Sequence, residues 1–184
     1  MHDPMALVTD YLLGIVALVF ASRIRHVHRM WALAFLFTAA GAFLGGSYHA
    51  FAPDDQLLWK ATTFAVGLAS FYLLSGADRR FTIFAVVKLI VYMSWMITHD
   101  GFVWVIVDYG ISLLLIAISS ILQRSPAMPW ILGSIAMSIA GGAVQYSGWS
   151  IDPTWFDFND IYHVIQTVAL WMLYRAAFLI KPSS

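Results

Sequence analysis

The sequence contains no cysteine, and charged residues make up only 11% of its 184 positions. Without cysteine there are no disulfides, thiolate metal ligands or cysteine nucleophiles, so a bound metal would need histidine, carboxylate or amide ligands. Every acidic residue is an aspartate, and ten acidic residues balance ten basic ones. This balance gives no indication of nucleic-acid binding, which requires clustered excess positive charge.

Apolar residues are abundant instead, at 61% of the chain, and the mean hydropathy is +0.78. A soluble domain carries roughly a quarter charged residues, and one membrane-spanning helix needs about 20 residues. We therefore predict an all-α membrane protein, a single seven-transmembrane-helix bundle over residues 1–184. The expected spans are Ala6–Ser22, Met30–Phe51, Leu57–Ser75, Phe81–Thr98, Phe102–Leu122, Pro129–Ser147 and Asn159–Ile180. The first run lacks a basic leader and a small-residue cleavage pattern, which favours a span over a cleaved signal peptide.

The breaks between these runs alternate in charge. Basic residues occupy Ser22–Arg29, Ala77–Arg80, Arg124, Arg175 and Lys181. Acidic residues occupy the other breaks, at Asp3, Asp54, Asp55, Asp100, Asp152, Asp157 and Asp160, with Lys60 as a partial exception. Because short basic loops stay in the cytoplasm, the pattern predicts an N-terminus outside and a C-terminus in the cytoplasm.

With this orientation, polar residues of several spans fall in the outer half of the bundle. They are Ser47 and His49 on the second span, His99 and Asp100 at the end of the fourth, Asp108 on the fifth, and Asn159, Asp160 and His163 on the seventh. An ionisable residue in a span usually faces the bundle interior or a water-filled cavity. The sequence therefore predicts an outward-facing polar site.

Helical spacing places several polar residues on shared faces. The sets are Asn159, His163 and Gln166; Lys88, Tyr92, Trp95 and His99; and Asp108 with Ser112. We expect these faces to turn inward. Some of these residues have structural alternatives. His99 can be an interfacial residue, and Asp157, Asn159 or Asp160 can cap the last helix. Lys88 and Asp108 can form an ion pair, which we favour over a proton path.

Two short segments carry a family resemblance. Gly45–Ala50 reads G-G-S-Y-H-A, and Phe158–Gln166 reads F-N-D-I-Y-H-V-I-Q. With seven spans, these segments resemble the CREST superfamily, which contains the alkaline ceramidases and the progestin/adipoQ receptors. Its pattern is Ser-x3-His on the second helix, Asp on the third and His-x3-His on the seventh.

His49 matches the histidine of the second helix, and His163 matches the second histidine of the seventh. Asn159 stands where the first histidine of that pair belongs. Gly45 stands where the serine belongs, with Ser47 close by, and the third span contains no carboxylate.

The resemblance implies zinc bound by His49, His163 and Asn159, and hydrolysis of a lipid amide by a metal-activated water. Asp160, Asp108 or His99 could supply another ligand, and Asp108 or Asp160 could act as the general base.

We therefore predict a metal-dependent hydrolase of a lipid amide or ester, whose partners are membrane lipids and a lipid-like substrate. One alternative is a non-enzymatic lipid-binding or receptor-like bundle. Another is a small proton- or ion-coupled carrier that uses Lys88, Asp108 and His99. Haem ligation by His49 and His163 is also open.

Overall fold

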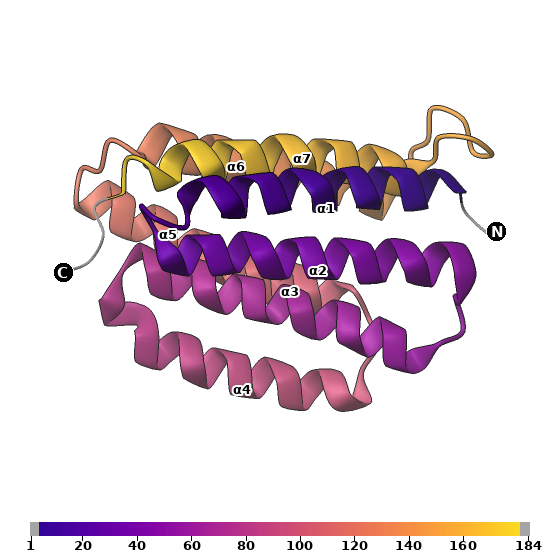
Figure 1. The fold of residues 1–184 in the computed structure, drawn as a ribbon, viewed down its shortest axis with the longest axis horizontal. Helices are drawn as coiled ribbons and strands as arrows, with labels where there is room; N and C mark the ends of the chain where they lie inside the picture. The colour runs from indigo at the N-terminus through magenta and orange to yellow at the C-terminus, as the bar shows by residue number, and fades with distance from the viewer. Residues whose placement is uncertain (1–3, 181–184) are drawn as a thin grey trace.

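The computed structural model describes residues 4–180, which form seven α-helices that run antiparallel to their neighbours in the chain (Figure 1). The helices are α1 (Pro4–Ile24), α2 (Arg29–Phe51), α3 (Gln56–Ala77), α4 (Thr82–Thr98), α5 (Val103–Leu122), α6 (Met128–Ser147) and α7 (Phe158–Ala177), with a short 3-10 turn, η1 (Arg79–Phe81), before α4. The helical fold predicted from the apolar runs is confirmed. In the described chain, α1, α2, α3, α5, α6 and the segment Arg79–Thr98 are long and apolar enough to cross a membrane.

The helix ends follow from the residues found there. Asp55 caps α3, because its side chain accepts hydrogen bonds from the backbone N–H groups of Leu57 and Leu58. Gly148 ends α6 in the left-handed conformation that glycine adopts without steric cost. The predicted span ends agree within a few residues, and the largest difference is at α7, which ends at Ala177.

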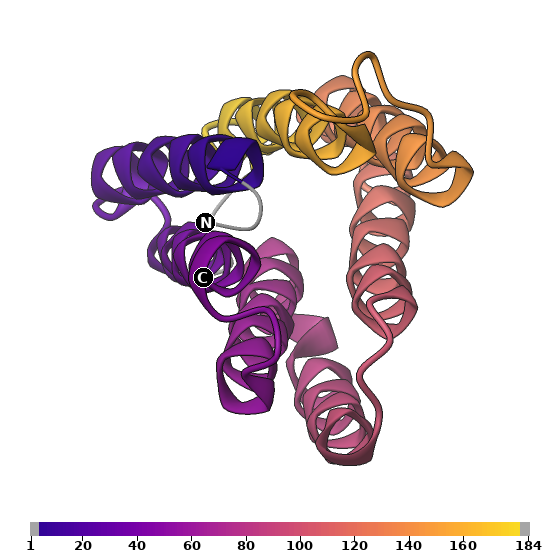
Figure 2. The same ribbon diagram turned by 90° about the vertical axis from the view of Figure 1, so that its right-hand side faces the viewer.

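Viewed along the bundle, the helices form a ring in which α1 lies between α2 and α7 (Figure 2). α3 contacts α2, α4 and α5, while α6 lies between α5 and α7. The first and last helices are therefore side by side. α4 is at the periphery of the bundle. Apart from marginal contacts, it packs only against α3, η1 and α5 among the described elements.

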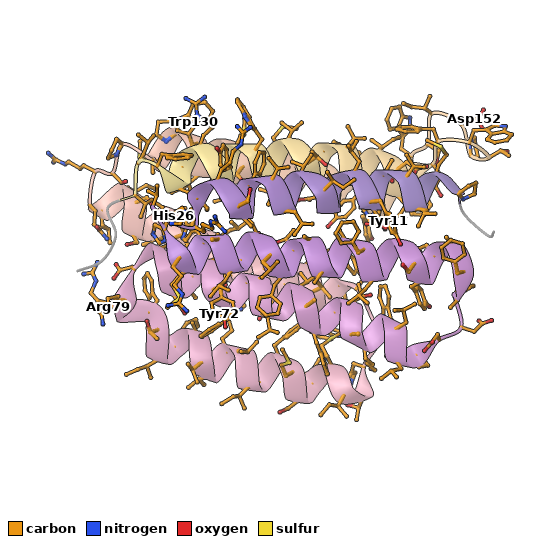
Figure 3. All side chains as sticks on the ribbon, viewed as in Figure 1. Tyr11, His26, Tyr72, Arg79, Trp130 and Asp152 are labelled. Atoms are coloured by element: carbon orange, nitrogen blue, oxygen red, sulfur yellow. The ribbon has the colours of Figure 1, made fainter. Side chains whose placement is uncertain are left out.

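The loops define two chemically different ends of the bundle. The basic end carries residues 25–28, 78–81 and 123–127, and the acidic end carries residues 52–55, 99–102 and 148–157. His26 and Arg79 lie at one end and Asp152 at the other (Figure 3). The alternation of the loops is thus confirmed, except that Asp3 and Lys181 lie outside the described residues. Lys60 is at the acidic end, where it forms an ion pair with Asp100.

The packed core occupies the half of the bundle nearer the basic end. It includes the fully buried side chains of Trp31, Phe35, Leu73, Leu74 and Ile116. Dense packing at the basic end leaves space for a cavity in the middle of the bundle and towards the acidic end.

Candidate functional site

A cavity of about 750 Å³ lies inside the ring. Its walls come from α1, α2, α3, α5, α6 and α7, together with Phe102 from the loop before α5. The inner part is largely apolar and includes Leu13, Leu113, Ile135, Leu170 and Leu173. The part nearer the acidic end is more polar and includes Asp10, His49, Gln145, Asn159 and His163. The cavity is thus amphipathic along its length.

His163 is held at the cavity wall by residues of α1. Its Nε2 lies 3.2 Å from Oδ1 of Asp10, and its Nδ1 lies 3.2 Å from the hydroxyl oxygen of Thr9. The same hydroxyl lies 3.0 Å from Oδ1 of Asp160. All four side chains are buried. This chain of contacts joins α7 to α1 and sets the orientation of the imidazole.

The number of protons in this chain of contacts limits the hydrogen bonds that His163 can form with a ligand. A neutral imidazole that donates from Nε2 to Asp10 accepts at Nδ1 from the single Thr9 proton. An imidazolium donates from both nitrogens and leaves the Thr9 proton for Asp160. The Thr9 hydroxyl also lies 3.1 Å from the Met5 carbonyl and 3.3 Å from the Ala6 carbonyl, which compete for its proton. In all of these arrangements Nε2 faces Asp10 and Nδ1 faces Thr9, so α1 covers both nitrogens.

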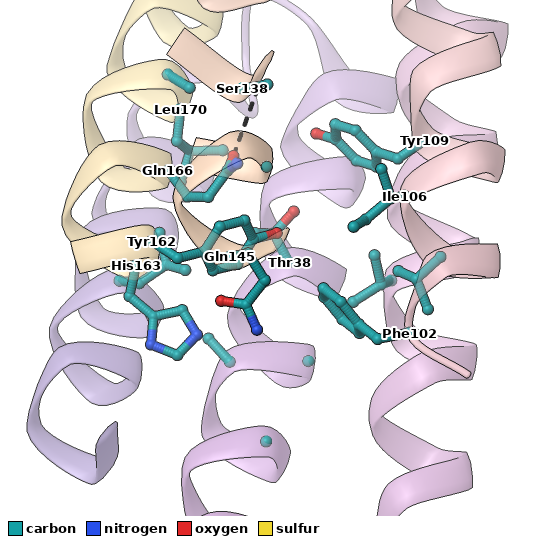
Figure 4. A pocket seen from close by; sticks show the side chains of 18 of the residues that line it. Thr38, Phe102, Ile106, Tyr109, Ser138, Gln145, Tyr162, His163, Gln166 and Leu170 are labelled. Atoms are coloured by element: carbon teal, nitrogen blue, oxygen red, sulfur yellow. Dashed lines mark hydrogen bonds between the residues drawn. The ribbon is translucent and has the colours of Figure 1, made fainter. Parts of the chain in front are cut away.

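Four of the predicted site residues do line the cavity: His49, Asn159, His163 and Gln166. The shared inward face predicted for the last three is therefore confirmed. Gln166 accepts a long hydrogen bond of 3.5 Å from Ser138 of α6 (Figure 4). His49 comes from α2 and lines the same cavity as His163.

The inward face predicted for α4 is wrong in part. Lys88 and Tyr92 point into the protein, but Trp95 is 42% exposed and His99 does not line the cavity. The helix ends at Thr98, so His99 has extended backbone and leaves the helical spacing. Its ring stacks on Trp95, with the ring centroids 3.7 Å apart.

The predicted ion pair of Lys88 and Asp108 is confirmed. The Lys88 ammonium lies 2.5 Å from Oδ1 of Asp108 and donates to Ser70, whose hydroxyl is 2.9 Å from that of Ser112. This buried cluster lies between α3, α4 and α5 and does not border the cavity. The general-base role suggested for Asp108 therefore has no support from its position.

Other predicted residues make structural contacts. Asp157 caps α7, and Asp160 completes the capping box by accepting from the Asp157 backbone N–H at 3.0 Å. Ser47 bonds to the Phe43 carbonyl at 2.7 Å and to the Tyr11 hydroxyl at 2.9 Å. Asp160 thus has two structural roles, as a cap and as a partner of Thr9.

Comparison with protein families adds one finding. Residues 5–181 match the model of a family of unknown function, DUF6962. The chain belongs to this family. No curated protein and no solved structure matches the chain.

Asp10 and Thr9 belong to the site although the sequence patterns did not predict them there. The available signal was Asp10 itself, a single carboxylate inside the first apolar run. Such a residue is expensive in a membrane and is usually paired or functional.

The residues that the structure describes contain no group of three or more histidine and aspartate side chains placed to hold a metal. His163 would also have to leave Asp10 or Thr9 to offer a nitrogen. This arrangement does not fit the zinc site that the CREST resemblance implies, and zinc binding stays a prediction that metal analysis would test.

Proposed function

We propose that this chain is a multi-pass membrane protein that binds one alkyl chain of an amphiphile, with the polar group of the ligand near His49 and Asn159. The observation that carries the proposal is the cavity of about 750 Å³, apolar inside and polar towards the acidic end. Its volume falls within the roughly 300–1,000 Å³ typical of ligand pockets. We further propose that all seven helices span and that the basic end faces the cytoplasm, because short basic loops are retained there.

An unpaired polar atom in the wall supports a ligand with a hydrogen-bonding group. Oε1 of Gln145, near the acidic end, is buried and has no hydrogen-bond partner within the described chain. Gln145 lines the cavity and projects into it (Figure 4). A buried acceptor without a partner costs about 1–3 kcal/mol, which a bound polar group would offset.

We infer a lateral opening between α5 and α6, through which a ligand would enter from the bilayer. Leu114 of α5 and Ile139 of α6 line the cavity and are both more than half exposed. Each lies well inside its helix, about 12 Å from the nearer end at 1.5 Å per residue. Gly110 and Gly142, which also line the cavity, have open space where a side chain would be. An opening at this depth would face lipid tails.

The contacts of the two ring nitrogens favour a ligand-binding role for His163 over a catalytic one. A general base needs a nitrogen within reach of the attacking water, and both nitrogens of His163 contact α1. The imidazole therefore serves better as a fixed wall group than as a proton acceptor.

The proposal can be tested with dodecanol and the purified protein in nanodiscs, with empty nanodiscs as the correction for partition. We expect saturable binding of one molecule per chain. Gly142→Phe, which places a ring in the opening, should weaken binding at least about tenfold. Ile83→Phe on the exposed face of α4 is the matched control and should bind normally. Absence of saturable binding to the wild-type protein would contradict the proposal.

A second candidate is the hydrolase of a lipid amide or ester. It is favoured by one observation, that His49 and His163 reach the same cavity from two helices. It predicts stoichiometric zinc and hydrolysis of a lipid amide or ester, both lost in His49→Ala and in His163→Ala. A protein that binds no transition metal, even after reconstitution, and that releases no fatty acid would rule it out.

A further inference from the structure

Aromatic rings surround the end of the cavity that is nearer the acidic loops. Trp59 of α3, Phe102 and Tyr162 of α7 all line this end. The ring centroids of Trp59 and Phe102 are 6.1 Å apart, as are those of Phe102 and Tyr162. His49 continues the series at 6.4 Å from Trp59. We call Trp59, Phe102 and Tyr162 the aromatic collar. Phe102 and Tyr162 approach each other from the α5 side and the α7 side of the cavity (Figure 4).

The lining of the cavity favours a cation over an anion. Apart from its histidines, Asp10 is the only ionisable acid or base other than tyrosine among the described lining residues, which include no lysine or arginine. Lys60 follows Trp59 in sequence, but its ammonium binds Asp100 and the Met96 carbonyl. The ring of Tyr162 lies 5.5 Å from that of His163, which contacts Asp10 at 3.2 Å, so the carboxylate lies near the collar.

These features disfavour anionic headgroups. The Asp10 carboxylate would repel a carboxylate or phosphate of the ligand, and the described lining residues include no lysine or arginine to bind it. The low dielectric constant of the site would increase this repulsion. A primary ammonium would donate to carboxylate and amide oxygens such as Oε1 of Gln145, whereas the collar offers aromatic faces, which suit an ammonium that carries methyl groups. A quaternary ammonium needs no acceptor and is attracted by aromatic faces and by a carboxylate.

We propose that the aromatic collar and Asp10 form a binding site for a quaternary ammonium group carried on an alkyl chain. The proposal rests on the proposed function, because the alkyl chain would occupy the inner part of the cavity. The collar would contact the methyl groups, and Asp10 would balance the charge while it keeps its contact with His163.

The test compares dodecyltrimethylammonium, dodecanol and dodecanoate, which share one alkyl chain, on the protein in nanodiscs. Dissociation constants are corrected for partition into empty nanodiscs. We expect the ammonium compound to bind at least about tenfold more tightly than dodecanol, and dodecanoate to bind most weakly. Asp10→Asn keeps the shape of the side chain and should remove the preference for the cation.

Removal of one ring of the aromatic collar should selectively weaken the binding of the ammonium compound. Trp59→Leu is expected to raise its dissociation constant by roughly three- to thirty-fold and to leave dodecanol little changed. Trp104→Leu is the matched control, because Trp104 meets Trp95 edge to face and does not line the cavity. Phe102→Leu provides a second collar variant if Trp59→Leu does not fold.

The outcomes separate this site from the proposed function. Dodecanol or dodecanoate binding as tightly as the ammonium compound overturns the ammonium site and leaves alkyl-chain binding intact. A preference for the cation that survives Asp10→Asn and both collar variants also overturns it. No binding of any of the three compounds overturns both proposals.

Discussion

The contact between Thr9 and His163 is the first residue-scale feature that can be tested. Thr9→Val keeps the side-chain shape but removes the hydroxyl shared by His163 and Asp160. Leaving these buried groups without that partner should cost about 1–3 kcal/mol, seen as a lower melting temperature in detergent. Thr9→Ser retains the hydroxyl and should melt near the wild type. Equal melting of Thr9→Val and the wild type would show that the contact contributes nothing.

Asp78 at the basic end should make stability depend on acid pH. Its carboxylate accepts from Arg80, Ser119 and Gln123. The hydrogen bonds from Arg80 lower the pKa of the carboxyl from 3.8 to about 2. Because the pKa is lower in the folded state, the stabilisation is complete above 3.8 and is lost as the pH falls through about 2.

The melting temperature of the wild type should therefore fall as the pH is lowered across this interval. Asp78→Asn should show a shallower fall, because the amide does not titrate. Arg80→Gln should lose stability at a higher pH than the wild type, because the carboxyl pKa returns towards 3.8. The same pH profile in all three proteins would contradict this role of Asp78.

At the scale of the helix, polar contacts hold α4 to the bundle. Lys88 binds Asp108, and the Tyr92 hydroxyl donates to the Thr63 carbonyl at 2.9 Å. The opposite face of α4 exposes apolar side chains such as Ile83 and Ile90. The ion pair is thus an important part of the attachment of this helix.

Breaking the pair from one side should be worse than replacing both partners. Lys88→Met leaves a buried, unpaired carboxylate and should cost about 3–5 kcal/mol. Lys88→Met combined with Asp108→Leu should recover most of that loss, because an apolar pair carries no unmet charge. Unfolding in mixed micelles measures both. A double variant as unstable as the sum of the two single variants would contradict the pairing.

The sequence predicts the positions of the helices better than it predicts which helices pack together around the site. Helix positions follow from apolar runs, and the spacing of Asn159, His163 and Gln166 was enough to place them on one wall. The neighbours of that wall depend on α1 packing beside α7, which no local pattern encodes. Asp10 was missed for this reason. His99 was misplaced because the helix was assumed to continue past Thr98.

For the whole molecule, the orientation in the membrane can be measured directly because the chain has no cysteine. Thr154→Cys places a thiol in the loop before α7, and Ser125→Cys places one in the loop before α6. The basic loops predict that a membrane-impermeant maleimide labels Thr154→Cys on intact cells. Ser125→Cys should react only after the membrane is permeabilised. The reverse pattern would invert the proposed topology.

The most direct test of the central claim, that the cavity holds an alkyl chain, is photo-crosslinking with a diazirine-bearing fatty alcohol in nanodiscs. The account predicts saturable labelling of cavity residues such as Ile135 and Leu170, competed by dodecanol. The exposed face of α4, at Ile83 and Ile90, should be labelled without saturation, as bulk lipid contact requires. Labelling confined to such outer faces, with none on the cavity wall, would contradict the account.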